Sequence, residues 1–215
     1  MHINNTLKAL LILLVISSCS NNENETDNPN ELIICEGDVT LKSQEEINSF
    51  GQNGCQKIIG SLTIDDTGSN NDENADIFDL TPLNNIVEVT ESVFIINNPN
   101  ITNINALNNL NKIGNFFMIQ INESLVEING LNNLEKIGST LSIYTNKSLL
   151  KISGFNKIKR ITNNKESIYD GDMEISFNAN LSEVNGFSQL ESISSIHIRG
   201  NENLKKIWGF NSLTE

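Results

Sequence analysis

The chain repeats itself about every 24 residues, and this period constrains its fold more than any other feature. The motif Asn-x-x-Leu/Ile recurs at spacings of 24, 24, 32 and 23 residues, with its asparagines at Asn98, Asn122, Asn146, Asn178 and Asn201. A fixed period of about 20 to 50 residues indicates a solenoid, in which each repeat packs on its neighbours. Solenoids usually bind through their surface, so the repeat predicts the architecture well and the ligand poorly.

Within one repeat the spacing of apolar residues changes from two to three. Period two predicts a short strand with one buried face, whereas period three favours turns or 3₁₀-like segments over an α-helix. The strand positions of successive repeats are Leu62/Ile64, Val93/Ile95, Phe117/Ile119, Leu141/Ile143, Met173/Ile175 and Ile196/Ile198. We therefore predict a mainly β fold in which six coils stack into a parallel sheet.

The repeated asparagine predicts a half-buried ladder, in which each side chain hydrogen bonds to the backbone of its own or the next coil. The alternative is a row of surface asparagines that only promote solubility. Glycines precede a Leu/Phe position at Gly130, Gly154, Gly186 and Gly209. There we expect a left-handed backbone or a tight corner.

Two repeats are longer than the others, and their extra residues predict loops. One excess falls in the acidic run after Ile64, and the other lies near residues 163–172. Loops in solenoids often carry specificity. The first loop offers the oxygen ligands that calcium prefers at Asp65, Asp66, Asp72 and Asp76, but without the spacing of an EF-hand. A solvated acidic loop is the alternative, and we expect no other metal and no cofactor.

Residues 1–18 are predicted to be a signal peptide, because Lys8 precedes an apolar run that is too short to span a bilayer. The run ends in Ile16-Ser17-Ser18-Cys19, which resembles the lipobox of bacterial lipoproteins. The resemblance implies cleavage before Cys19 and attachment of lipid to its sulfur, and an ordinary secretory signal is the alternative. Residues 19–33 begin with a long polar run and are expected to form a flexible tether.

The start of this tether also bears on localisation. Residue 20 is serine rather than aspartate, and the acidic, asparagine-rich segment that follows resembles surface-export signals of Bacteroidota lipoproteins. The resemblance implies a lipid-anchored protein of the outer membrane that faces outward.

Cys35 and Cys55 remain as an even pair in a chain bound for an oxidising compartment, which favours a disulfide. Such a bond closes a loop of about 20 residues and contributes roughly 3 kcal/mol in the chain-entropy model. Two buried free thiols are the alternative, and a metal site is disfavoured because no histidine accompanies the pair.

Charge and histidine content exclude some classes of function. The net charge is −13, from 14 basic and 27 acidic residues, which argues against nucleic acid and against docking on anionic lipid by charge. After removal of the signal peptide, His197 is the single histidine, which leaves little material for histidine metal sites or catalytic triads.

The motif Leu141-x-Ile143-x-x-Asn146-x-x-Leu149-x-x-Ile152-x-Gly154-Phe155 resembles the repeat of receptor L domains. These are related to leucine-rich repeats but have Asn-x-x-Leu in place of Asn-x-Leu. The segment from Cys35 to Gly51 resembles the cap that precedes such repeats in bacterial surface proteins. Over residues 35–215 the resemblance implies a right-handed parallel β-solenoid of about six coils, with a cap at 34–61 and repeats at 62–215. It also implies binding or adhesion, although the ligand does not transfer between members.

Strand residues between the inward positions point outward and predict a recognition face. They are Thr63/Asp65, Phe94/Ile96, Met118/Gln120, Ser142/Tyr144, Glu174/Ser176 and His197/Arg199. Phe94, Ile96, Met118 and Tyr144 are expected to form an apolar patch of the kind that marks an interface, and Gln120, Glu174, His197 and Arg199 to be its polar binding residues. The alternative is that the cap or the loop at 65–76 folds over the patch.

Glu174 is expected on the strand next to that of His197 and Arg199, with Glu174 and His197 at the same position, which raises the possibility of an acid/base pair. Lyases with parallel β-helices combine acidic calcium ligands with a basic residue. Here the acidic cluster and the basic residues are five coils apart, which corresponds to about 24 Å at the spacing of β-strands. We therefore expect a solvated ion pair and no catalytic residue.

The sequence thus predicts a lipid-anchored surface protein that acts as a non-enzymatic binding or adhesion module for a protein or glycan. The alternatives are a structural component of an envelope complex and, less favoured, a polysaccharide-processing enzyme. The sequence ends at Phe210-Asn211-Ser212-Leu213-Thr214-Glu215, part-way through a coil. Either the last turn closes over this end, a partner covers it, or the chain is a fragment.

Overall fold

The computed structural model describes residues 31–67, 75–161 and 171–214. Residues Leu32–Glu215 form one compact unit, which contains both the predicted cap and the predicted repeats. The predicted signal peptide, Cys19, most of the tether and Asp72 lie outside the described residues. In the part of the chain that the structure describes, no helix is both long and apolar enough to span a bilayer.

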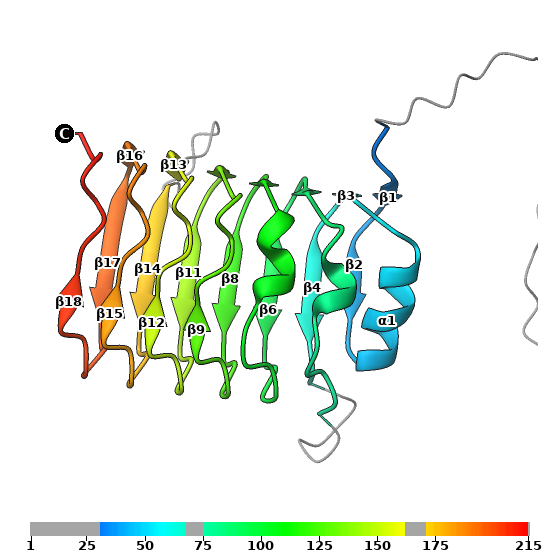
Figure 1. Ribbon diagram of the computed structural model, residues 1–215, viewed down its shortest axis with the longest axis horizontal. Coiled ribbons are helices and arrows are strands. Elements are labelled where there is room, and N and C mark those ends of the chain that lie inside the picture. Colours follow the sequence, from blue (N-terminus) through cyan, green and yellow to red (C-terminus); the bar gives the residue numbers. More distant parts are fainter. Residues whose placement is uncertain (1–30, 68–74, 162–170, 215) are drawn as a thin grey trace, which may run out of the picture. The chain divides into compact units, whose positions relative to one another are not determined.

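A seven-stranded parallel sheet, here called the main sheet, runs along this unit (Figure 1). Its order is β17-β14-β11-β8-β6-β4-β2. The strands are β2 (Val39–Leu41), β4 (Leu62–Asp65), β6 (Val93–Ile96), β8 (Phe117–Gln120), β11 (Leu141–Tyr144), β14 (Asp172–Ser176) and β17 (Ser195–Arg199). In β4, β6, β8 and β11 buried and half-buried residues alternate, so the expected pattern of period two is confirmed.

The segments with period three contribute to two further parallel sheets, which the prediction of turns did not foresee. The second sheet has the order β1-β3-β5-β7-β10-β13-β16 and the third β18-β15-β12-β9. The repeats contribute two-residue strands to them: β5 (Glu88–Val89), β7 (Lys112–Ile113), β9 (Glu127–Ile128), β10 (Lys136–Ile137), β12 (Lys151–Ile152), β13 (Arg160–Ile161), β15 (Glu183–Val184), β16 (Ser192–Ile193) and β18 (Lys206–Ile207). Each pairs with equivalent residues of a neighbouring coil, and such contacts leave little trace within a single repeat.

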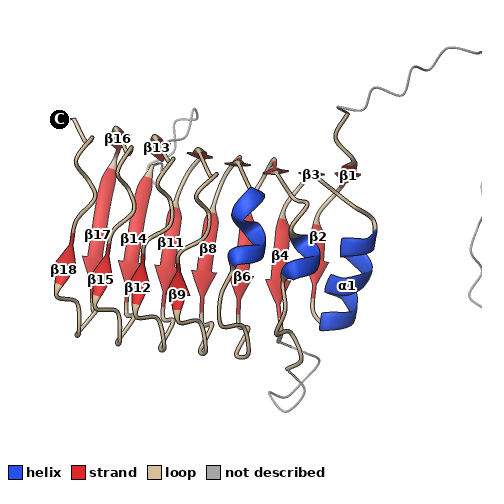
Figure 2. Cartoon of the chain, in the orientation of Figure 1, coloured by secondary structure: helices blue, strands red, loops and turns tan. Residues whose placement is uncertain are grey.

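Helical turns accompany the early part of the stack (Figure 2). Two 3₁₀ segments, η2 (Thr81–Leu83) and η3 (Asn105–Asn109), occupy positions where later repeats have simple turns. The expectation of turns or 3₁₀-like segments is therefore confirmed, with 3₁₀ turns in these two repeats and turns closed by i→i+3 hydrogen bonds in the later ones, such as Leu134 to Leu131 and Ile158 to Phe155.

The cap joins the sheets instead of preceding them. It consists of β1 (Ile34–Glu36), β2, α1 (Gln44–Gln52) and β3 (Lys57–Ile59). Because β2 pairs with β4, the main sheet gains a seventh strand beyond the six that the repeats predicted. The hydroxyl of Ser43 accepts the N–H of Glu46 at 3.2 Å and so caps the start of α1.

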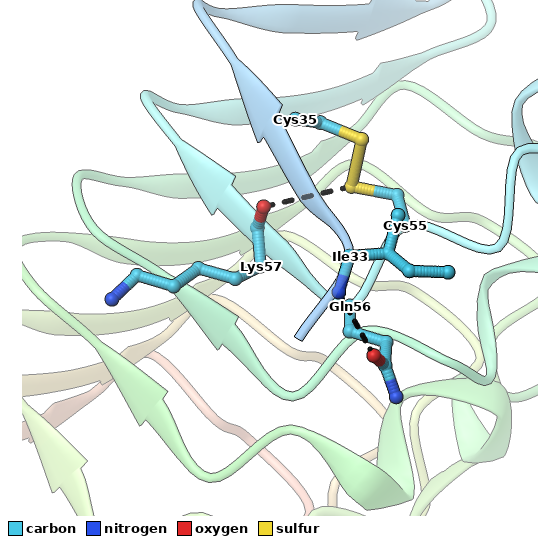
Figure 3. Close-up of a disulfide and its surroundings, with 5 residues drawn as sticks. All are labelled: Ile33, Cys35, Cys55, Gln56 and Lys57. Carbon is cyan, nitrogen blue, oxygen red and sulfur yellow. Dashed lines mark hydrogen bonds between the residues drawn. A yellow bond between two sulfur atoms is a disulfide. The ribbon is translucent and has the colours of Figure 1, made fainter. Parts of the chain in front are cut away.

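A disulfide between Cys35 and Cys55 closes the cap, as predicted (Figure 3). Cys35 lies in β1, and Cys55 is 2% exposed just before β3. Beside the disulfide, the side chain of Gln56 accepts the N–H of Ile33 at 3.0 Å. The alternative of two free thiols is therefore wrong, and the bond fastens the first strand of the second sheet.

A ladder of buried asparagines runs through the stack. Asn98, Asn122, Asn146 and Asn178 are all 0% exposed. The backbone N–H of Asn122 donates to Oδ1 of Asn146 at 3.0 Å, and Nδ2 of Asn146 donates to the carbonyl of Ile119 at 2.9 Å. The same two kinds of bond recur one coil further on, where the N–H of Asn146 donates to Oδ1 of Asn178 and Nδ2 of Asn178 donates to the carbonyl of Ile143. The predicted ladder is confirmed, although these four asparagines are fully buried rather than half-buried, and the alternative of a solvent-exposed row is wrong.

The backbone turns through a left-handed residue just before each asparagine of the ladder. The φ angles there are 56° at Asn97, 53° at Ile121, 54° at Thr145, 56° at Phe177 and 62° at Gly200. For β-branched residues such as Ile121 and Thr145 this conformation is strained by about 1–3 kcal/mol. It persists because the ladder bonds and the sheet on either side determine the corner.

The glycines before the Leu/Phe position differ in backbone conformation. Gly186 and Gly209 are left-handed, as expected, with φ of 103° and 93°. Gly130 and Gly154 are not, because the residues after them, Leu131 and Phe155, have positive φ instead. A Cβ at Gly154 would lie 2.2 Å from the carbonyl oxygen of Gly130, so this glycine is required by the close approach of adjacent coils.

The last coil leaves apolar residues exposed. Ile207 and Trp208 are 51% and 47% exposed, whereas Phe210 stacks on Phe187 with ring centroids 5.1 Å apart. Closure of this end by the last turn, one of the three possibilities raised by the sequence, is therefore incomplete.

Replacing Asn146 with leucine is expected to destabilise the stack. The change removes the partners of Asn122 and of the carbonyl of Ile119, and a buried polar group left unpaired costs about 1–3 kcal/mol. We expect Asn146→Leu to lower the free energy of unfolding by about 3 kcal/mol in urea titrations. The matched control is Asn85→Leu at an exposed turn position. Equal stability of the two variants would contradict a structural role for the ladder.

Glu88 is expected to stabilise the fold in a pH-dependent manner. Its carboxylate contacts Lys112 at 2.8 Å and Lys57 at 3.1 Å, and the hydrogen bond from Lys112 is the main cause that lowers the pKa of Glu88. Because the pKa is lower in the folded state, the ionised Glu88 stabilises the fold at pH values above its usual pKa of 4.5. This stabilisation disappears as the pH falls through the pKa that Glu88 has in the folded state. Glu88→Gln should therefore cost about 1 kcal/mol in urea unfolding near neutral pH. A difference that does not shrink as the pH falls below 4.5 would contradict this account.

Candidate binding face

The outer side of the main sheet carries the predicted recognition residues in two rows. The first row pairs Thr63, Phe94, Met118, Ser142, Glu174 and His197 across successive strands, and the second pairs Asp65, Ile96, Gln120, Tyr144, Ser176 and Arg199. The residues of both rows that lie in β4, β6, β8 and β11 are half-buried, whereas His197 and Arg199 in β17 are exposed. Ser176 is an exception to the expected pattern because it is 0% exposed.

The apolar half of this face consists of Phe94, Ile96 and Met118, here called the apolar strip. The cap does not cover it, because α1 packs against η2 and β2 at the start of the stack (Figures 1 and 2). The other alternative, burial by the loop at 65–76, rests largely on residues 68–74, which lie outside the described residues. The strip itself remains half-buried rather than closed off.

A pocket of about 430 Å³ lies beside the strip and crosses β8, β11, β14 and β17. We call it the face pocket. It is lined by Phe116, Phe117, Met118, Thr140, Ser142, Asp172, Glu174 and His197. Its lining is apolar at Phe116, Phe117 and Met118 in or beside β8, and it carries the carboxylates of Asp172 and Glu174 from β14 with His197 from β17.

Three of the lining residues were missed by the sequence analysis: Phe116, Thr140 and Asp172. Phe116 and Thr140 immediately precede their strands, and Asp172 begins β14, so none belongs to the alternating core pattern. Phe116 could have been predicted as a surface residue of this face, because it is a large apolar residue at an outward position. It is 38% exposed.

The polar wall contains the residue types of a hydrolytic triad, but in the wrong order. The hydroxyl of Ser195 donates to Asp172 at 2.5 Å, and Nε2 of His197 lies 3.0 Å from the same hydroxyl. In nucleophilic catalysis the histidine lies between the serine and the carboxylate, so that it accepts the serine proton. Here the serine lies between them, and the arrangement does not activate a nucleophile.

Glu174 and His197 are paired in register, as predicted, but they are not an acid/base pair. The carboxylate of Glu174 accepts hydrogen bonds from Arg199 at 3.0 Å and from Ser176 at 2.9 Å. The side chain of Arg199 is 68% exposed, so the bond is the solvated ion pair that we expected.

An aromatic cluster at the other end of the strands was also missed. The rings of Tyr144 and Phe177 meet edge to face with centroids 5.4 Å apart, and Arg199 lies 5.9 Å from the centroid of Phe177. Phe177 is 48% exposed and left-handed, and a Cβ at Gly200 would collide with its ring. Its signal in the sequence is a phenylalanine at a corner position that other repeats fill with Asn, Ile, Thr or Gly.

The described carboxylates of the predicted calcium loop are engaged by the backbone. Asp66 is 4% exposed and accepts the N–H groups of Asp76 and Ile77, and burial nevertheless raises its pKa. Asp76 in turn accepts the N–H of Gln44 at 2.9 Å, which ties the loop to the cap. Within the described ranges no group of three or more His, Cys, Asp or Glu residues is placed to hold a metal. A calcium site that includes Asp72 stays a prediction.

Comparison with protein families gives one match. Residues 54–116 match the receptor L domain. The receptor L domain is a ligand-binding, non-enzymatic domain family, and the matched segment includes β6, which carries the first part of the apolar strip. Neither a search of curated proteins nor a search of solved structures found a significant match. Over residues 54–116, this match independently supports the resemblance to receptor L domains that was noted in the sequence.

Proposed function

We propose that this chain is a cell-surface lipoprotein whose main sheet acts as a non-enzymatic binding or adhesion module for a protein or glycan partner. The observation that carries the proposal is the half-exposed apolar strip that continues into the face pocket. A contiguous apolar area rimmed by polar groups is typical of an interface. The receptor L domain match, from a ligand-binding family, supports binding rather than catalysis.

The fold supplies a rigid support for such a face. Strands β6, β8, β11 and β14 each end near a buried asparagine whose backbone N–H donates to the asparagine of the next coil, so the outward side chains keep fixed spacing. Fixed side chains lose little conformational freedom on binding, which favours affinity. We take the winding to be right-handed with about six coils, as in the family that the sequence resembles.

The proposed anchor and tether complete this picture. Lipid on Cys19 would fix the protein in the outer membrane, and residues 19–33 contain mostly polar side chains. A fully extended tether of this length reaches about 50 Å, enough to hold the module clear of lipid headgroups. The net charge of −13 disfavours adsorption to anionic lipid, so the binding face stays available for a partner.

Charge introduced into the apolar strip is expected to weaken partner capture without unfolding the chain. In Phe94→Glu or Met118→Glu a carboxylate would have to be desolvated on binding. We expect at least a tenfold loss of affinity for a partner first recovered by proximity labelling around the lipidated protein in its own cells. Thermal melting should show that both variants stay folded.

The matched control is Val126→Glu, which adds the same charge at a 38% exposed apolar residue beside β9 in the third sheet. This variant should bind like the natural protein. If it loses as much affinity as Phe94→Glu, net charge rather than the face controls binding. If folded Phe94→Glu and Met118→Glu bind normally, the outer side of the main sheet is not the binding site.

A further inference from the structure

The face pocket combines an apolar wall with the carboxylate of Asp172, which forms no ion pair with a lysine, arginine or histidine in the described part of the chain. We propose that it receives a basic side chain, lysine or arginine, of a partner protein. This inference rests on the proposed function, because it names the ligand of the same face.

The acidic wall provides the charge. Asp172 accepts the hydroxyl of Ser195, but no lysine, arginine or histidine among the described residues forms an ion pair with it. The second lining carboxylate, Glu174, already pairs with Arg199, and no lysine or arginine of ranges 31–67, 75–161 and 171–214 lines the pocket. A carboxylate in a partly enclosed site attracts a cation more strongly than one in open water.

The apolar wall fits the stem of a long basic side chain. Lysine and arginine bury their methylene groups along apolar surface and keep the charged head at polar groups. Met118 offers an adaptable thioether, and the 38% exposed ring of Phe116 can also receive a cation on its face. The pocket volume of about 430 Å³ holds such a side chain together with part of its backbone.

A protein fits this site better than a small free amine. The apolar strip adjoins the pocket through Met118, which belongs to both, and it extends to Phe94 and Ile96 on the neighbouring strand. A small amine would leave this strip in water, whereas a protein covers it. The net charge of −13 also favours the approach of a basic partner surface.

Methionine methyl signals provide a direct test. The chain has three methionines, of which Met118 lines the pocket and Met173 is 0% exposed in the same sheet. The full chain labelled with ¹³C at these methyl groups is titrated with Nα-acetyl-lysine amide and Nα-acetyl-arginine amide. We expect the Met118 signal to shift and saturate while the Met173 signal stays in place. The neutral Nα-acetyl-norleucine amide should bind at least fivefold more weakly.

Two charge variants locate the interaction. Asp172→Asn keeps the shape of the pocket and removes the negative charge of residue 172, and it should weaken binding of both basic probes at least fivefold. Glu135→Gln removes one charge from an exposed position beside the second sheet and should leave both affinities unchanged. Equal loss in the two variants would overturn the inference, since it would reflect net charge alone.

Other occupants are outcomes of the same titration. The inference is overturned if the norleucine probe or methyl β-glucoside shifts Met118 as strongly as the basic probes. It is also overturned if spermidine binds more tightly than either amide. Normal binding of the basic probes to Asp172→Asn, together with loss of partner capture in Phe94→Glu, would refute the pocket assignment but leave the proposed face intact. If Asp172→Asn still binds the basic probes and Phe94→Glu still captures the partner, both the pocket assignment and the proposed face are refuted.

Discussion

The stack depends on the hydrogen bonds that each buried asparagine forms with the coil beside it. Asn122, Asn146 and Asn178 have no access to water, so their amides must find partners in the protein. Each amide binds the backbone of a neighbouring coil, which fixes the rise and register between coils. A shift of one residue would turn the apolar columns outward and leave the amides unpaired, so a single register satisfies both requirements.

This register also determines what the protein presents to a partner. Inward residues such as Ile119 and Ile143 build the core, while the residues between them form two straight outward rows. The rows change from apolar to polar along the stack, and the face pocket lies at the transition, between Met118 and Asp172. Binding would then be a property of side chains held by the ladder, and variants in these rows can alter recognition while the fold is retained.

Much of the fold was predictable because the repeat aligns equivalent positions of successive coils. Alternation at Leu141 and Ile143 indicates a strand with one buried face, and the recurrence of Asn146 in other repeats indicates a ladder. The second and third sheets were not predictable, because a two-residue strand is recognised only by its pairing with another coil and has no pattern of its own in the sequence. Left-handed backbone at Ile121 and Thr145 contradicts their intrinsic preference and results from the ladder. The outward rows were predicted, whereas the pocket was not, because Phe116, Thr140 and Asp172 in its lining lie beside or at the start of strands, outside the alternating pattern.

Hydrogen exchange of the backbone amides of the ladder tests the central claim most directly. The N–H groups of Asn122, Asn146 and Asn178 donate to side-chain oxygens of the next coil, so their exchange reports on the ladder itself. The account predicts that the amides of Asn122 and Asn146, in the middle of the stack, exchange only through global unfolding, with the same protection free energy. Exchange as fast as that of exposed turn amides would show that the coils are held together without the ladder, and would contradict the account.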